Sequence, residues 1–471
     1  IDSNSFIFFY GGEYGSVGLA LAKGQGFSDP FSLGTGATAW VAPLLPAVMG
    51  GIFAAAGFKI TATYWALLGI KIGSLALGAG LIWAVLQKDN RGYAPLSLLW
   101  MAMLCWVYHI ELFSLYHDEW LIFLVGALAF WAWQQRARIG GRIALIAAFS
   151  AAALCNPILW GALTVVALVC AQNGAAGAAD GGPPAFARRS FWLALGLSFL
   201  LILGWTARNW IRLGMFAPIK SNAGYELFQA QVASRNGVPD ASTFARHPII
   251  RTSPESRAYR SLGETRFIRA RRDAAVRSIL ADPAGYARRV GQRFINAFVF
   301  TASPVNTAVV DARIGSADRQ RLEKAGFVAF RNDQVVWLDL DDAGKDLLTA
   351  LPSLGLDDPQ SVAENWRTMV EGHHWYRFSW ERLVGGALSA GMPWVALFFA
   401  LLLRGPAALI PAARWAGLFV LLYLMPYVLI SHYLRYQVPL LGMHAVLLTT
   451  GTVALLDGLR RDSVPPAPPG E

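Results

Sequence analysis

Apolar residues in this chain gather in long uninterrupted stretches, unlike the alternating pattern of a strand or the one-sided stripe of a soluble helix. A helix needs roughly 17 to 25 apolar residues to cross a bilayer interior about 30 Å thick. Several stretches reach that length, and the shorter ones require neighbouring helices to cover their ends. The pattern predicts helices at 63–87, 94–112, 118–134, 143–155, 157–171, 192–207, 384–403, 415–431 and 437–456.

Lysine and arginine cluster in the short connections at alternate ends of consecutive stretches. Such clusters mark the cytoplasmic side of a membrane protein. The connections at 113–117 and at Asn156-Pro157 hold neither residue, and the turn at 432–436 holds only Arg435, so these three are expected outside. The cytoplasmic clusters are Lys88 and Arg91, then Arg136, Arg138 and Arg142, then Arg188 and Arg189, then Arg404 and Arg414, and finally Arg460 and Arg461.

This topology makes the chain an α-helical polytopic membrane protein with an inserted, mainly α extracytoplasmic segment. Because the chain begins outside, at Ile1 and without an initiator methionine, we expect a membrane helix or signal segment ahead of it. The expected parts are a first outer loop with helices along the membrane surface (1–62), transmembrane helices (63–207), the outer segment (208–383), further transmembrane helices (384–457) and a cytoplasmic tail (458–471).

The outer segment carries its own secondary-structure signals. Helical periodicity runs through 264–299, and the stretch VVWLDLDDAGKDLLTAL, from residue 335, favours a strand followed by a helix. No repeat of 20 to 50 residues is visible, which argues against a solenoid.

Composition supports a membrane protein. Hydrophobic residues fill 55% of 471 positions, only 15% are charged, and the mean hydropathy of +0.41 exceeds what a water-soluble domain carries. The net charge of +10 is explained by the arginines of the short loops, and no base-reading motif accompanies it, so we predict no nucleic-acid partner. The sequence contains no GxxxxGK[ST], HExxH or CxxC motif, so it shows neither a nucleotide site nor a common metal site.

Carboxylates stand at the outer ends of two predicted elements. Glu13 and Asp29 flank the first run of the first outer loop, and Asp118 and Glu119 open the stretch at 118–134. Acids near the lipid boundary are costly unless they are used or paired. One interpretation is that an acid from each loop faces a shared cleft and that one of them accepts a proton from an attacking hydroxyl group. The alternative is that they only anchor helix ends at the interface.

Four stretches, in this order, resemble bacterial polyprenyl-phosphate-dependent glycosyltransferases of the glycosyltransferase C superfamily, which includes protein mannosyltransferases and aminoarabinose transferases. They reach from the first loop to the last predicted helix. The stretches are EYGSVGLALAKGQGFSDPF with TGATAWVAPLLP, WTARNWIRLGMFAPIKSNAGYELF at 205–228, GETRF at 263–267 with ADPAGYARRVGQRF at 281–294, and HYLRYQVPL at 432–440.

The resemblance implies a glycosyltransferase C-like fold in the cell envelope, in the bacterial inner membrane, with the active site facing the periplasm or cell exterior. It implies transfer of a sugar, with inversion, from a polyprenyl-phosphate donor to a glycan, lipid or protein acceptor among membrane lipids. Glu13 matches the family's first-loop catalytic base, with Asp29 as the alternative. Asp118 matches a second acid that positions the acceptor or an ion, with Glu119 as its alternative. A divalent metal ion is a candidate cofactor.

Basic and polar residues in two of the matching stretches are candidates for binding the donor. Arg435, beside Tyr436, sits where an outer turn enters the last span, and a guanidinium there can grip a phosphate with paired hydrogen bonds. Arg208, Lys220 and Asn222 follow the span at 192–207 and are expected near the phosphate or sugar. The alternatives are snorkelling of Arg435 to the headgroups and anchoring of a helix end by the other three.

Two other functions stay open at this point. A transporter or flippase for a lipid-linked sugar or small solute predicts polar residues buried in the middle of spans and internally repeated halves. An inactive glycosyltransferase-like scaffold predicts a first-loop acid that faces no cleft.

Overall fold

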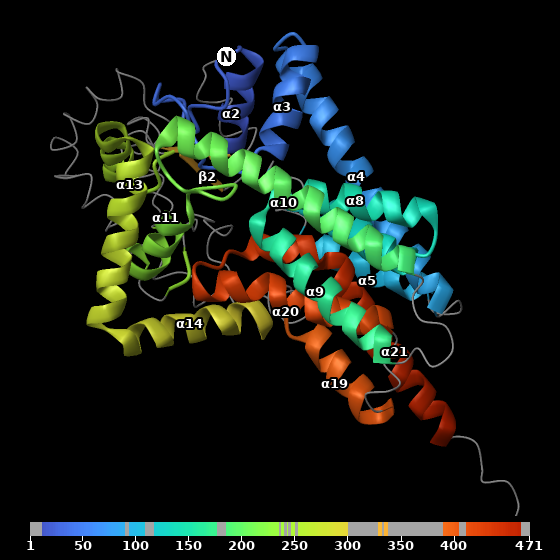
Figure 1. Cartoon of the computed structure of the whole chain (residues 1–471). Coiled ribbons are helices and arrows are strands. Elements are labelled where there is room, and N and C mark those ends of the chain that lie inside the picture. Colours follow the sequence, from blue (N-terminus) through green and yellow to red (C-terminus); the bar gives the residue numbers. More distant parts are fainter. Residues whose placement is uncertain are drawn as a thin grey trace, which may run out of the picture.

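The structure is a computed structural model, shown in Figure 1. It describes residues 12–89, 94–108, 117–176, 185–234, 237–239, 243, 246–249, 253–299, 328–331, 334–337, 390–404 and 411–462.

Each predicted apolar stretch overlaps an observed helix, while residues 109–112 and 384–389 of two stretches lie outside the described residues. Four helical segments are long and apolar enough to cross a membrane, namely Thr61–Lys88, Arg189–Leu213, Pro411–Leu429 and Arg435–Leu459. The prediction of an α-helical membrane protein is therefore confirmed at this level. The helices are α4 (Ile60–Asp89), α5 (Ala94–Val107), α7 (Glu119–Gln134), α8 (Ile139–Cys155), α9 (Pro157–Ala176), α10 (Ala185–Leu213), α19 (Met392–Arg404), α20 (Pro411–Leu429) and α21 (Leu441–Asp462).

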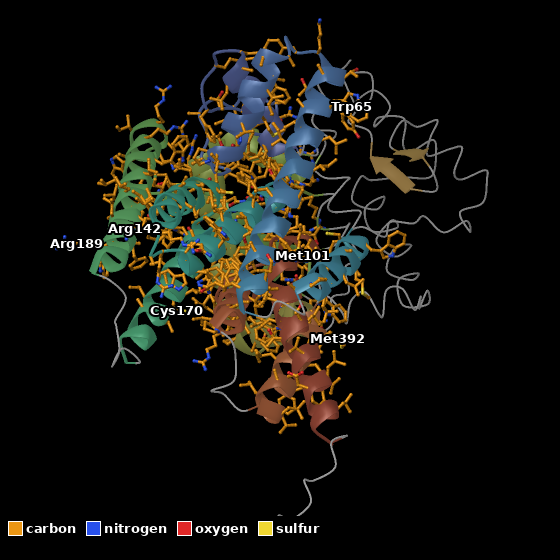
Figure 2. The ribbon with its side chains drawn as sticks, turned by 90° about the vertical axis from the view of Figure 1, so that its right-hand side faces the viewer. Trp65, Met101, Arg142, Cys170, Arg189 and Met392 are labelled. Atoms are coloured by element: carbon orange, nitrogen blue, oxygen red, sulfur yellow. The ribbon has the colours of Figure 1, made fainter. Side chains whose placement is uncertain are left out.

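Helices α7 and α21 form the centre of the bundle, and α4 and α10 lie at its outside. Most side chains of α7 are buried, and it packs against α4, α8 and α9. Helices α4 and α10 instead expose large apolar side chains, such as Trp65 at 63% and Leu200 at 63%. Figure 2 shows Trp65 on the outer surface of α4. Apolar side chains on the outside of a bundle are what a lipid solvent favours.

The first outer loop folds into two packed helices, α2 (Glu13–Ala22) and α3 (Leu44–Ala55). They approach closely because glycines face each other, and a Cβ at Gly50 would lie only 3.0 Å from the Gly18 carbonyl oxygen. Such small-residue contacts hold apolar helices together without long side chains. The pair therefore fixes the first turn of α2, where Glu13 lies.

Helix α10 continues to Leu213, so the boundary expected at 208 between the membrane helices and the segment 208–383 falls inside this helix. The first part of that segment forms α11 (Ala223–Phe228) and the π-helix η2 (Gln229–Ala233). The helical prediction for 264–299 is confirmed by α13 (Pro254–Ala281) and α14 (Pro283–Phe298). Asp282 separates the two helices, since its side chain accepts a hydrogen bond from the Gly285 N–H and a proline follows it.

A two-stranded antiparallel pair also belongs to the outer segment. Strand β1 (Val328–Arg331) pairs with β2 (Gln334–Trp337), with Val328 opposite Trp337. Strand β2 covers the first part of the predicted strand. The helix predicted after it lies outside the described residues.

Candidate functional site

A polar pocket lies where α2, the start of α7 and the end of α20 meet. It contains about 470 Å³ of empty space, part of which opens to solvent. Helix α2 contributes its first two residues, and the 3-10 helix η5 (Leu434–Leu440), between α20 and α21, contributes Arg435 and Tyr436. The lining residues are Glu13, Tyr14, Trp40, Val41, Asp118, Glu119, Ile122, Asn156, Lys220, Asn222, Glu226, Tyr423, Tyr427, Arg435 and Tyr436.

The sequence predicted that acids from two outer loops converge, and the structure brings them to one pocket. Glu13 and Asp118 both line it, and the side chain of Tyr14 hydrogen-bonds to Asp118. The pocket brings together seven of the nine candidate residues, which are Glu13, Asp118, Glu119, Lys220, Asn222, Arg435 and Tyr436.

Glu13 occupies the first turn of α2, in a position that requires the glycine before it. Gly12 has a φ of 54°, and a Cβ there would lie 2.5 Å from the Ile249 side chain, so only glycine fits without strain. The Glu13 carboxylate lies 3.5 Å from Nε2 of His247 and hydrogen-bonds to the side chain of Trp40. These neighbours hold the carboxyl group in one orientation at the pocket wall.

Burial sets the protonation of this pair. Loss of water raises the pKa of Glu13, although the positive charges of Arg435 and Lys220 oppose the shift. Burial also lowers the pKa of His247, to about 3. The imidazole is therefore neutral near pH 7, and its contact with Glu13 is not an ion pair. A carboxylate whose pKa is raised in this way is a stronger base than an exposed one.

Arg435 lies across the pocket and is held from several sides. Its Nε lies 3.4 Å from the Glu119 carboxylate, and its Nη1 lies 3.1 Å from Nε2 of His117. The guanidinium also stacks over the rings of Tyr433 and Tyr436, at 5.0 and 5.6 Å from their centroids. A cation held this firmly can meet an anionic ligand without first losing side-chain freedom.

Lys220 reaches the pocket from a strained turn. Its backbone N–H donates to the Pro218 carbonyl oxygen at 2.9 Å, and Ile219 between them has a φ of 70°. Such a conformation is unfavourable for a β-branched residue and persists only where its surroundings impose it. Here the Trp205 indole N–H donates to the Ile219 carbonyl oxygen at 2.9 Å. The bond from Trp205 therefore stabilises the strained turn that places Lys220 at the pocket wall.

Aromatic rings form one wall of the pocket. Tyr436 stacks on Tyr427 with 3.9 Å between ring centroids, and the Asn156 amide donates to the Tyr427 hydroxyl at 3.2 Å. The Asn156 side chain also accepts from the Ile158 and Leu159 N–H groups, so it caps α9. A flat wall with hydroxyl and amide groups suits the faces and hydroxyls of a sugar ring.

Arg208 and Asp29, which the sequence analysis assigned to substrate binding, do not line the pocket. Arg208 donates to the carbonyl oxygens of Thr38 and Phe27, and its guanidinium stacks on Trp205. Asp29 accepts from the N–H groups of Leu33 and Gly34. Both therefore hold the first outer loop in shape.

Glu264, in the GETRF stretch, was missed as a functional residue by the sequence analysis. It is buried and accepts four hydrogen bonds, two on each carboxylate oxygen. The donors are the Thr38 hydroxyl at 2.5 Å, the Ala39 N–H at 2.8 Å, the Ser221 hydroxyl at 2.7 Å and the Tyr259 hydroxyl at 2.9 Å. Glu264 thus ties the segment that leads to Trp40 to the segment that follows Lys220.

The sequence analysis also missed eight lining residues, namely Tyr14, Trp40, Val41, Ile122, Asn156, Glu226, Tyr423 and Tyr427. Tyr14, Trp40 and Glu226 fall within the stretches that carry the resemblance, which is the signal that could have found them. Burial raises the pKa of Glu226, whose Oε1 accepts from the Asn222 amide at 3.3 Å.

The pocket has more acids than bases, with four carboxyl groups against Arg435 and Lys220. Within the described part of the chain, no three His, Cys, Asp or Glu side chains gather closely enough to hold a metal ion. The arrangement offers a buried carboxylate on one side and two cations that can meet an anion.

Comparison of the chain with protein-family models, with curated proteins and with solved structures finds no match in any of the three.

Proposed function

We propose that this chain is a membrane glycosyltransferase with a glycosyltransferase C-like fold. It moves a sugar, with inversion, from a polyprenyl-phosphate donor to a glycan, lipid or protein acceptor on the outer face of a bacterial inner membrane. The observation that carries the proposal is that one pocket is lined by Glu13 together with Arg435 and Lys220, whose positive charges act on Glu13. A base and two cations in one pocket are what attack on a phosphate-activated sugar requires.

In the proposed reaction, an acceptor hydroxyl oxygen attacks the anomeric carbon of the donor sugar. The bond from that carbon to the phosphate oxygen breaks, and its electron pair leaves with the polyprenyl phosphate. Glu13 takes the proton of the attacking hydroxyl, while Arg435 and Lys220 offset the negative charge on the departing phosphate. Asp118 and Glu119 orient the acceptor and Arg435. The donor ester is already activated, so no nucleotide is consumed.

Sugar transfer by the purified protein tests this proposal. The protein in proteoliposomes is given a radiolabelled polyprenyl-phosphate sugar and an envelope lipid and glycan extract as acceptor. We expect label to move from the donor into acceptor and free polyprenyl phosphate to appear in equal amount. Release of neither product, with labelled donor crossing to the other leaflet instead, would contradict the proposal and favour a flippase.

The transfer rate is expected to fall as the pH is lowered. The midpoint of this fall is expected above pH 4.5, the ordinary pKa of a glutamate. Only the ionised carboxylate accepts a proton, and burial raises the pKa of Glu13, so the rate rises as pH rises through that higher value. His247, with a pKa of about 3, stays neutral throughout and does not contribute. The measurement is initial rate against pH between 4 and 9 (about one unit per step is enough to locate the limb).

Lys220→Gln provides the matched variant for this profile. The Lys220 charge lowers the pKa of Glu13, so its removal is expected to move the acid limb to still higher pH. An acid limb that stays at the same pH in Lys220→Gln would contradict the assignment of the limb to Glu13.

One observation favours the transporter as a second candidate. Lys71 lies in the middle of α4 and is buried, with 2% of its surface exposed, and a cation at that depth is costly unless it has a function or partner. It lies within electrostatic reach of Glu119, so it also extends the positive charge behind the pocket. If Lys71 supports donor binding, Lys71→Met is expected to slow sugar transfer. If the chain is a flippase, the same variant is expected to stop only the movement of the donor across the bilayer.

A further inference from the structure

Helix α14 buries a polar side and exposes an apolar side, the reverse of a surface helix in water. Arg293 and Asn296 are buried, at 0% and 4% exposure, whereas Phe294 and Ile295 are 44% and 46% exposed. Ala287, two helical turns before these two apolar residues, is exposed as well. A helix in water buries its apolar face and exposes its polar one. The outward face of α14 therefore fits an apolar neighbour.

The inward polar side fixes α14 against the end of a membrane helix. Arg293 donates from Nε to the Val428 carbonyl oxygen at 2.6 Å and from Nη2 to the Leu429 carbonyl oxygen at 3.2 Å. The Tyr286 hydroxyl donates to the same Leu429 oxygen at 3.0 Å. Leu429 is the last residue of α20, one of the four helical segments able to cross a membrane. Helix α14 thus lies at the depth where that span ends.

The outward face continues the apolar surface of the neighbouring helices. Figure 1 shows α14 running from the lower end of α13 towards the red and orange helices. Phe298 of α14 contacts Trp394 of α19 with 5.5 Å between ring centroids, and Val395 of α19 is itself exposed. Leu280, at the corner between α13 and α14, is 73% exposed. One apolar surface therefore runs from the bundle onto α14.

Arg288 lies beside this face and gives the surface its charge. Its side chain is 80% exposed and 4.0 Å from Asp282. It lies seven residues before Ile295, which places it on the same side of the helix, towards the polar flank. An arginine at the edge of an apolar helix face matches the phosphates above the acyl chains of a bilayer.

We propose that α14 rests in the outer boundary of the lipid bilayer, with Phe294 and Ile295 among the acyl chains and Arg288 among the headgroup phosphates. The occupant of its outward face is a lipid surface that contains anionic headgroups. This inference rests on α14 and the ends of α19 and α20, and it holds whether or not the chain transfers sugar.

The placement has a consequence for the pocket. The Gln437 amide donates to the Ala297 carbonyl oxygen of α14 at 2.8 Å, while Arg293 holds residues 428 and 429. Helix α14 therefore braces both ends of the segment 428–437, which carries Arg435. A helix seated on the bilayer would hold Arg435 near the depth of lipid phosphates.

Site-directed spin labelling tests the proposal in lipid. Single cysteines replace Ile295 or Phe294 in a background in which Cys105, Cys155 and Cys170 are serine, and the full chain is reconstituted in bilayers of phosphatidylcholine and phosphatidylglycerol. We expect nitroxides at 294 and 295 to collide more with oxygen than with a water-soluble nickel complex. A label at Leu200 is the lipid-facing reference, and a label at Arg272 on α13, whose side chain is 56% exposed, is the aqueous reference.

Two results would overturn the proposal. If labels at 294 and 295 collide mainly with the nickel complex, like the Arg272 reference, the face lies in water. If they are shielded from both oxygen and nickel, a second copy or another protein covers it. The collision rates of a label at position 288 are expected to lie between those of the two references.

Discussion

Glu13→Gln is expected to lower the rate of sugar transfer by about 100-fold to 10,000-fold, the range that a positioned general base contributes. Glutamine keeps the size and the hydrogen-bonding capacity of the side chain but cannot accept the proton of the attacking hydroxyl. The contacts with Trp40 and His247 can persist, so the pocket keeps its shape. The measurements are kcat and KM for the labelled donor, and we expect the loss in kcat with little change in KM.

Asp29→Asn is the matched control for Glu13→Gln. Asp29 is the other acid of the first loop, and its φ of 54° is tolerated by asparagine, whose Oδ1 can still accept from Leu33 and Gly34. We expect this variant to transfer sugar at the wild-type rate. If Asp29→Asn lost sugar transfer while Glu13→Gln kept it, Asp29 would be the base. That result would contradict the assignment of Glu13 as the base.

Glu264→Ala is expected to destabilise the protein by about 4 kcal/mol, because each buried donor left without an acceptor costs about 1–3 kcal/mol and such costs are not fully additive. Four donors lose their acceptor at once. Thr38 also accepts from the Trp40 N–H at 2.9 Å, so the change reaches a residue that orients Glu13. The measurement is the melting curve of the protein in detergent, together with the transfer rate below the melting temperature.

Glu264→Gln separates the contribution of charge from that of hydrogen bonding. A glutamine oxygen can keep the bonds from Ala39 and Ser221, and the hydroxyls of Thr38 and Tyr259 can turn to accept from its amide group. We expect most of the stability to return, with a remaining loss of about 1 kcal/mol, since hydrogen bonds to a neutral group are weaker. An equally unstable Glu264→Gln would show that the negative charge, rather than the set of acceptors, holds the region together.

The membrane helices were predictable because their signal is local. A stretch of apolar residues must bond its backbone internally in lipid, so each stretch forms a helix wherever it lies in the bundle. The ends were less predictable, because they depend on what surrounds them. Helix α10 runs on to Leu213 because Arg208 and Asn209, although polar, find partners in the first loop and at Ala217.

The acids of the site were predictable because a carboxylate at a lipid boundary is costly and so draws attention to Glu13 and Asp118. The resemblance to glycosyltransferases pointed to Arg435 and Lys220 in the same way. The sequence could not show that Arg208 bonds to the carbonyl oxygens of Phe27 and Thr38, since those partners lie 181 and 170 residues away. Glu264 was missed for a similar reason, because three of its four donors, at Thr38, Ala39 and Ser221, lie 226, 225 and 43 residues away.

The central claim is that the pocket between Glu13 and Arg435 binds the phosphate and sugar of a polyprenyl-phosphate donor. A structure of the protein in lipid nanodiscs, with a non-transferable phosphonate analogue of the donor, tests it directly. The account predicts the phosphonate within hydrogen-bonding distance of Arg435 and Lys220, with the anomeric carbon turned towards Glu13. An analogue bound elsewhere, with Arg435 still paired to Glu119 and the pocket filled only by water, would contradict it.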